Sequence, residues 1–324
     1  MLEIDKKMID LLRNGVTLQK MRLKLEIYDS DIVKKINLLS DKGYSIHRVF
    51  NEYGVKFQIL DKIVTPLQDN IEIPIGAKFS FLVISDTHLG NIYENLSLVE
   101  GVYKYASENN IHYVFHLGDM IEGCALNNQN SQRIKRLDIH EQVDYVTKKY
   151  PKIDNINTIY ILGNHDYRCL TKGIDISKII EHRRLDMHFA GYKNSRLKIG
   201  NKIVLLQHPF MIDNTNKYDS EIRDLYVNPK FDLVLRGHTH QNGIYLNQDN
   251  SIVVSVPACY SSPSRKYPGA YEVEFTGDNV KLKSLILGDE PEIFSITNYD
   301  LKPKVKAIPT RIDKFNERLS KKNK

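Results

Sequence analysis

The chain has 324 residues, of which 41% are hydrophobic and 27% charged, and its formal net charge at pH 7 is +6. This length exceeds that of a typical single domain, so one large and one smaller domain are expected. The composition is that of an ordinary soluble protein, and the absence of any run of about 18 apolar residues excludes a spanning helix. The mild positive charge suits anionic partners, but it is also common in proteins that bind no nucleic acid.

The three cysteines indicate the compartment. Cys124, Cys169 and Cys259 are odd in number, widely spaced and in no Cys-x-x-Cys pair, which disfavours a disulfide framework and favours a reducing environment. The first seven residues also lack the apolar stretch of a signal peptide. We therefore expect a cytoplasmic protein that does not contact membranes.

Residues 1–60 predict a small α+β module. Apolar spacing predicts one helix from Glu3 to Arg13, a second that begins with Thr17 as its cap, and a third that begins at Ser30 or Asp31 and ends at Gly43. Two apolar runs then flank the turn residues Asn51 to Gly54, which predicts a hairpin. Three short helices followed by a two-stranded ribbon resemble the winged helix-turn-helix modules of DNA-binding proteins.

In that resemblance, the helix from Ser30 to Asp41 is the recognition helix. This helix would present Lys34, Lys35 and Asn37 outward. The hairpin would form the wing and carry His47 and Arg48. The alternative is a helical interaction or dimerisation module whose lysines form a solvated face.

Residues 61–77 predict a linker because they are rich in turn residues. A second domain is expected over residues 78–290, followed by a basic C-terminal tail over residues 291–324. In the second domain, five apolar runs each end in a polar cluster. These runs are Phe79 to Ile84, Ile111 to Leu117, Ile159 to Leu162, Ile203 to Leu206 and Phe231 to Leu235.

Helical patterns lie between some of these runs, for example from Leu96 to Ser107, from Gln142 to Tyr150 and from Ile176 to Glu181. Alternating strands and helices form an α/β sheet, whose ligands bind beyond the carboxyl ends of its strands. All five polar clusters are therefore expected at one edge of one sheet.

The clusters contain carboxylates, imidazoles and an amide but no thiolate. Such a set suits Mn²⁺, Fe²⁺, Zn²⁺ or related ions instead of a structural zinc of the cysteine type. Two ions about 3.5–4 Å apart would clamp the attacking and leaving oxygens of a displacement at phosphorus. The pattern thus predicts hydrolysis of a phosphoester, with one carboxylate bridging two ions.

The clusters read, in order, Asp86-x-His88, Gly118-Asp119, Gly163-Asn164-His165-Asp166, a lone His208, and Gly237-His238-x-His240. This series resembles the calcineurin-like metallophosphoesterase superfamily over about residues 79 to 274. The resemblance implies an α/β fold, a β-sandwich flanked by helices, and a hydrolase with two divalent metals, of which manganese is our first choice.

The resemblance also implies the roles of single residues. Asp86, His88 and His240 would hold one metal, Asn164, His208 and His238 the other, and Asp119 would bridge them. His165 would be a catalytic histidine that binds no metal and stabilises the phosphoryl group or protonates the leaving oxygen. Asp166 is expected to support the turn instead of binding metal.

Protein Ser/Thr phosphatases of this superfamily continue Gly-Asp with Asp-Arg-Gly, where the second Asp orients the catalytic histidine and the Arg grips phosphate. This chain has Glu122 and Gly123 there. Glu122 would replace the orienting Asp as a helper in catalysis, whereas the Arg is missing. A protein phosphatase is therefore disfavoured.

The motifs are shared with the Mre11-like nucleases, the cyclic-nucleotide phosphodiesterases and the lipid-precursor pyrophosphatases of this superfamily, and the chemistry does not separate these classes. The module of residues 1–60 and the basic residues Arg133, Lys135 and Arg136 favour a phosphodiesterase or nuclease that acts on DNA or RNA. The alternatives are an enzyme for a small nucleotide or phosphorylated metabolite, and a non-catalytic DNA-binding adaptor. The sequence leaves open the substrate, the metal and the oligomeric state.

Overall fold

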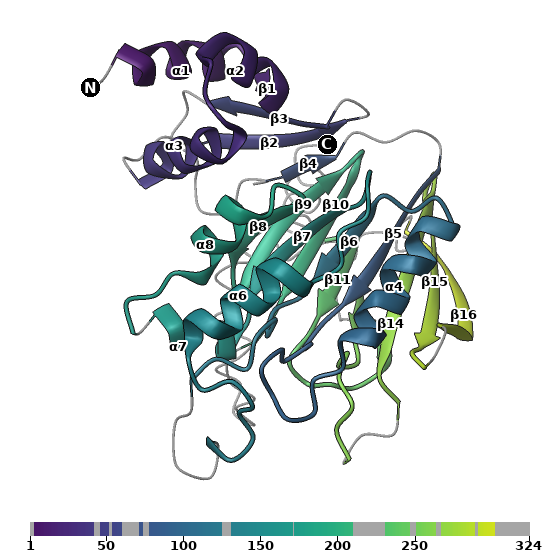
Figure 1. Cartoon of the computed structure of the whole chain (residues 1–324). Helices are drawn as coiled ribbons and strands as arrows, with labels where there is room; N and C mark the ends of the chain where they lie inside the picture. Colours follow the sequence, from purple (N-terminus) through teal and green to yellow (C-terminus); the bar gives the residue numbers. More distant parts are fainter. Residues whose placement is uncertain are drawn as a thin grey trace, which may run out of the picture.

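The structure is a computed structural model that describes residues 3–41, 46–51, 54–59, 71–73, 78–124, 131–170, 172–209, 231–246, 251–263, 267–288 and 291–301. Two β-sheets dominate it, with helices against one of them and a small helical group at the N-terminal end (Figure 1). Among the described residues, none of the helices is long and apolar enough to cross a membrane. All three cysteines are free, as expected.

The first sheet has seven strands in the order β16-β15-β14-β5-β6-β7-β8. Its parallel half consists of β5 (Lys78–Ile84), β6 (Tyr113–His116), β7 (Asn157–Leu162) and β8 (Met187–Tyr192). Its antiparallel half consists of β14 (Gly269–Thr276), β15 (Asn279–Ile286) and β16 (Glu292–Asp300). The strand β16 lies within the range that we expected to be a tail, and pairing with β15 gives it a place at the sheet edge.

The second sheet has nine strands in the order β1-β3-β2-β4-β9-β10-β11-β13-β12. Its central part consists of β9 (Asn194–Ile199), β10 (Lys202–Gln207), β11 (Leu233–Arg236), β13 (Ile252–Ser255) and β12 (Gly243–Leu246). Here β10, β11 and β13 run parallel to one another. The remaining strands come from the N-terminal part of the chain.

The two sheets pack face to face around a shared core. Along β5, Phe81 and Val83 point into this core, whereas Leu82 and Ile84 point to the opposite face of the sheet. Phe81 stacks on Phe115 with ring centroids 4.4 Å apart. From Phe81 to Ile84 both faces of the strand are buried, which explains why these four residues are all apolar. The result is the expected sandwich.

Helices cover the outer face of the seven-stranded sheet (Figure 1). They are α4 (Leu96–Glu108), α6 (Ile139–Lys149) and α8 (Ile176–Arg183), and the short α7 (Asn164–Leu170) follows β7 directly. The three longer helices confirm the three helical patterns of the sequence, with small shifts at their ends.

The expectation of one sheet for all five polar clusters was wrong. The strands β5, β6 and β7 belong to the seven-stranded sheet, whereas β10 and β11 belong to the nine-stranded sheet. An apolar run shows that a strand is buried, but it carries no information about which strand lies beside it. The sandwich nevertheless brings the carboxyl ends of these strands together at one end.

The N-terminal part contains three helices and three strands: α1 (Glu3–Arg13), β1 (Val16–Thr17), α2 (Leu18–Leu25), α3 (Asp29–Asp41), β2 (Ile46–Asn51) and β3 (Gly54–Ile59). Thr17 caps α2, as expected, by accepting a hydrogen bond from the backbone N–H of Lys20. The expected end of the third helix at Gly43 lies outside the described residues. A separate core of apolar side chains, including Met8, Leu12 and Ile36, holds these elements together.

This part continues into the second sheet. The strand β4 (Ile71–Ile73) lies in the range expected to be a linker and pairs in parallel with β2 on one side and β9 on the other. The helix α3 also packs against α8. Lys35, which we expected to point outward, forms an ion pair with Asp5 at 2.7 Å. Lys34 is exposed.

Candidate active site

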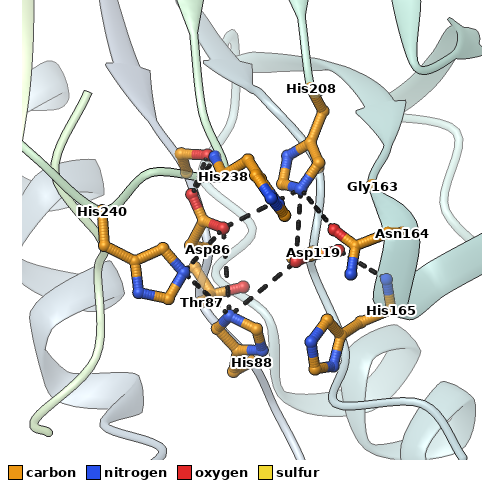
Figure 2. Close-up of polar contacts among 12 residues, drawn as sticks. Asp86, Thr87, His88, Asp119, Gly163, Asn164, His165, His208, His238 and His240 are labelled. Carbon is orange, nitrogen blue, oxygen red and sulfur yellow. Dashed lines mark hydrogen bonds and ion pairs between the residues drawn. The ribbon is translucent and has the colours of Figure 1, made fainter. Parts of the chain in front are cut away.

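The donor residues predicted from the sequence lie together at the carboxyl ends of the strands (Figure 2). Backbone hydrogen bonds tie the loops that carry them. The N–H of Asp86, after β5, donates to the carbonyl of Gly118, after β6, at 3.0 Å, and the N–H of Gly237, after β11, donates to the carbonyl of Gln207 in β10 at 2.9 Å. The site is thus built from strand ends of both sheets.

The first group of donors consists of Asp86, His88 and His240, whose ligand atoms lie within 4.8 Å of one another. Asp86 Oδ1 is 3.1 Å from His240 Nε2 and 3.9 Å from His88 Nε2. The two Nε2 atoms are themselves 3.4 Å apart. Two imidazole nitrogens and a carboxylate oxygen therefore converge on one point, which is the geometry of ligands around a cation.

The second group consists of Asp119, His208 and His238, again with ligand atoms within 4.8 Å. His208 Nε2 is 3.2 Å from Asp119 Oδ2 and 3.2 Å from the amide oxygen of Asn164. Its other nitrogen, Nδ1, lies 2.6 Å from the carbonyl oxygen of Leu117. That bond fixes the proton on Nδ1 and leaves the Nε2 lone pair for a metal.

Asp119 lies between the two groups. Its Oδ2 atom is 3.2 Å from His208 of the second group and 3.9 Å from His88 of the first. Its Oδ1 atom accepts the backbone N–H of His165 at 2.7 Å (Figure 2). The Asp119 carboxylate therefore faces both groups at once.

The electrostatics of the site favour bound cations. Burial opposes ionisation of Asp86 and Asp119, but His240 beside the former and His208 beside the latter hold the pKa of each carboxyl well below its usual range. Burial also opposes charge on the imidazoles, yet the carboxyl groups raise the pKa of His88 to about 8 and that of His208 to about 9. Both groups therefore attract positive charge, which divalent metals would supply.

The backbone at the site adopts a conformation that L-residues rarely use. Five donors have φ between 44° and 71°: Asp86, His88, Asp119, His238 and His240. They make up five of the nine non-glycine residues with positive φ in the described part of the chain. Such left-handed residues cluster at functional sites, where the surrounding structure holds them in place.

Glycines allow the strand ends to approach one another. A Cβ atom on Gly163 would collide with Asp119 and lie 2.7 Å from His208 Nε2. A Cβ atom on Gly237 would collide with Ser85 and lie 3.0 Å from His208 Nδ1. The glycines in the motifs are therefore required by the packing of the donors.

His165 and Glu122 form a third group with His88. The Nδ1 atom of His165 lies 2.8 Å from the backbone carbonyl of Glu122 and 3.6 Å from its side chain. The Glu122 carboxylate is closer to His88, whose Nδ1 is 3.0 Å away. The backbone of Glu122 thus orients His165, whereas its side chain orients His88, a contact that the sequence did not indicate.

The comparison with known families decides the class. The model of the family described as calcineurin-like phosphoesterase matches residues 79–242, a range that contains every donor named above. This chain belongs to the calcineurin-like phosphoesterase family. It is a metal-dependent phosphoesterase, and its donor groups fit divalent ions.

The chain is also similar to several solved structures, at low sequence identity. A conserved uncharacterized protein described as a predicted phosphoesterase, from Streptococcus pneumoniae, is 16% identical with a TM-score of 0.39, covering 70% of this chain and 99% of its own. Vps29 from Entamoeba histolytica, solved with Zn²⁺, is 14% identical with a TM-score of 0.40, and the match covers 69% of this chain and 99% of Vps29. A dimetal phosphatase from Danio rerio is 8% identical with a TM-score of 0.44, and the match covers 69% of this chain and 99% of the phosphatase. No curated protein matches the sequence significantly.

Buried residues beneath the phosphoesterase site support its loops. Asp166 accepts the backbone N–H groups of Met120, Ile121 and Gly163 at 2.9–3.1 Å. It therefore joins the loop of Asp119 to the loop of Asn164, which is the supporting role expected for it. Burial and the nearby Asp119 raise its pKa to about 7.

Sequence reasoning missed His116 and Thr87. His116 is buried, with Nε2 3.1 Å from the Thr87 hydroxyl and Nδ1 accepting the N–H of Gly118 at 3.2 Å. The Thr87 hydroxyl also donates to the carbonyl of Met120. Burial lowers the pKa of His116 to about 3, so this imidazole is neutral. Its place inside an apolar strand, three residues before Asp119, was the available signal.

Of the basic residues expected to face substrate, two are already paired. Lys135 and Arg136 both bind Glu94, at 3.1 and 2.5 Å, and the Arg136 guanidinium lies over the ring of Tyr145. Arg133 is exposed and lines a hollow next to His240. Of these three basic residues, Arg133 is therefore the one whose charge is available to a substrate at the phosphoesterase site.

Proposed function

We propose that this phosphoesterase is a two-metal phosphodiesterase that cleaves nucleic acid. The observation that supports this most is the pair of donor groups that share Asp119 between them. Asp86, His88 and His240 would hold one ion, and Asn164, His208 and His238 the other. Two divalent ions, manganese by preference, supply Lewis-acid activation of water and stabilise charge on the phosphoryl oxygens when bound.

The protein's own residues supply position and proton transfer. The Nδ1 atom of His165 lies 2.8 Å from the Glu122 carbonyl oxygen and 3.1 Å from the Arg168 guanidinium. Both contacts engage Nδ1, so Nε2 is the nitrogen that can meet substrate. Burial lowers the pKa of His165 despite the opposing effect of Asp119, which makes its protonated form a stronger acid. We infer that protonated His165 donates to the leaving oxygen as the P–O bond breaks.

Nucleic acid is favoured as the substrate by charge and by the N-terminal part. The chain carries a net charge of +6, and Arg133 lies open beside the donors. The helix α3 keeps Lys34 exposed. We propose that residues 1–60 form a winged helix-turn-helix module that contacts nucleic acid near Lys34, in a cytoplasmic enzyme.

A substrate panel tests this function. With Mn²⁺, the protein should hydrolyse bis-p-nitrophenyl phosphate and cut single-stranded DNA, duplex DNA or RNA, and Asp119→Ala and His165→Ala should each lower the rate by at least about 100-fold. Hydrolysis of mononucleotide esters without cleavage of any polymer would instead support an enzyme for small nucleotides. Rates that are indifferent to both substitutions would refute the two-metal site.

A further inference from the structure

A hollow of about 350 Å³ lies directly beside the first donor group. It is lined by His240 of that group and by Asn91, Tyr93, Arg133, Tyr260 and Ser262. The ring of Tyr260 packs against the rings of His88 and His240, with centroids 5.0 and 5.5 Å away. A molecule bound at the donors can therefore extend into this hollow.

Three loops build the walls of the hollow and hold one another in place. The N–H of Ile92 donates to the carbonyl of Arg133 at 2.9 Å, and the N–H of Ser261 donates to the carbonyl of Tyr93 at 3.0 Å. The Asn95 amide also donates to the Ser261 hydroxyl at 2.8 Å. Because these bonds connect the loops after β5, β6 and β13, the hollow is preformed.

The charge of the hollow suits an anion. Arg133 is its one cation, and none of the described residues that line it is acidic. Lys135 and Arg136 of the same loop are bound to Glu94, whereas the structure gives the Arg133 guanidinium no ion pair within its described part. An Arg side chain in this position can bind a phosphate through two parallel N–H donors.

We propose that this hollow binds the phosphate next to the scissile one in a nucleic-acid strand. Arg133 would grip that phosphate, and the rings of Tyr93 and Tyr260 would lie beside the nucleoside between the two phosphates. This proposal rests on the proposed function and adds the site for the second phosphate. Arg133 would also supply a phosphate-binding arginine. Protein Ser/Thr phosphatases of the superfamily have such an arginine at the position that Gly123 occupies in this chain.

The test compares substrates that differ only by one phosphate. They are the dinucleotide of thymidine with one internal phosphodiester, and the same dinucleotide with an additional 5′- or 3′-phosphate. The additional phosphate should raise kcat/KM of the wild-type protein, mainly through KM. In Arg133→Ala this gain should fall by about 10- to 100-fold, and Arg133→Lys should keep part of it.

Lys135→Ala is the matched control. It also removes one positive charge, two residues further along the chain, but the Lys135 side chain is already paired with Glu94. It should leave the gain from the second phosphate unchanged. An equal gain in wild type and Arg133→Ala, or an equal loss in Lys135→Ala, overturns the proposal.

A binding measurement separates this proposal from the proposed function. If the wild-type protein cleaves no polymer of the substrate panel, the proposed function fails. In that case, or if only the dinucleotides are left uncut, the affinity of the metal-free protein for a fluorescein-labelled thymidine octanucleotide is measured by anisotropy. About tenfold weaker binding by Arg133→Ala than by Lys135→Ala would retain Arg133 as a phosphate-binding residue. Equal affinities would reject it.

Discussion

The imidazole of His88 is held by the carboxylate of Glu122, with Nδ1 and Oε2 3.0 Å apart. The amide of Asn91 donates to the same oxygen at 2.9 Å, which keeps the carboxylate in place. This arrangement places the proton of His88 on Nδ1 and turns the Nε2 lone pair toward Asp86 and His240. Burial opposes ionisation of Glu122, but His88 and His165 lower its pKa, so it is a carboxylate at neutral pH.

Removing this carboxylate should weaken metal binding. Glu122→Ala should lower the affinity for Mn²⁺ by about 10- to 100-fold, because His88 loses the partner that fixes its tautomer and orientation. Glu122→Gln, whose amide oxygen can still accept the Nδ1 proton, should lower it less. Isothermal titration of the metal-free proteins measures both effects. Glu100→Ala, on the exposed face of α4, is the control and should leave the affinity unchanged; a similar loss there would contradict the role of Glu122.

The glycine at the end of β7 should be irreplaceable for geometric reasons. In Gly163→Ala the added Cβ atom would collide with Asp119 and press on His208, so the second donor group must separate. We expect the bound Mn²⁺, measured by elemental analysis after dialysis, to fall below two ions per chain. Gly101→Ala, whose added Cβ atom would lie 3.6 Å from Pro291, should keep full metal content and change stability by no more than about 1 kcal/mol. Full metal content in Gly163→Ala would show that the motif glycine is dispensable.

Asp166 should matter for stability as much as for activity. Asp166→Ala removes the acceptor of three buried backbone N–H groups and should lower the free energy of unfolding by about 3 kcal/mol. The rate should fall as well, because the loops of Asp119 and Asn164 lose their connection. Urea denaturation and phosphodiesterase assays measure the two effects. The exposed Asp154 provides the control substitution, and an Asp166→Ala protein as stable as Asp154→Ala would contradict this account.

His116 should make the metal-free protein sensitive to mild acid. Its pKa is lowered from 6.5 to about 3 in the folded chain, so below pH 6.5 the unfolded chain binds a proton that the folded chain does not. The free energy of unfolding should therefore fall as the pH drops from 6.5 toward 4, with a contribution from His116 of up to about 1.4 kcal/mol per pH unit. In His116→Gln this contribution disappears and the decline becomes shallower.

Urea denaturation of the metal-free proteins at several pH values between 4.5 and 7.5 measures the two slopes. His140→Gln, an exposed histidine at the start of α6, should keep the wild-type slope. Parallel curves for wild type and His116→Gln would show that His116 is not the group responsible.

The sequence by itself determined which residues could do the chemistry and where the strands end. Each of the five polar clusters directly follows an apolar run, and a run that is buried on both faces is recognisable without knowledge of its neighbours. The sequence also identifies the glycines of the motifs, but only the structure shows why they are needed. Asp119 and His208 lie where a Cβ atom on Gly163 would be, and Ser85 and His208 lie close to the Cβ position of Gly237.

The tertiary structure decided everything that depends on which elements are neighbours. The distribution of the five strands over two sheets, the pairing of β4 between β2 and β9, and the contact of Glu122 with His88 all join residues that lie far apart in the sequence. The ion pair of Lys35 with Asp5 could not be predicted from the sequence for the same reason. The helical pattern predicts a solvated lysine, and only the packed chain places Asp5 beside it. Local patterns report burial and chain direction, whereas hydrogen bonds and ion pairs between distant residues are set only when the chain packs.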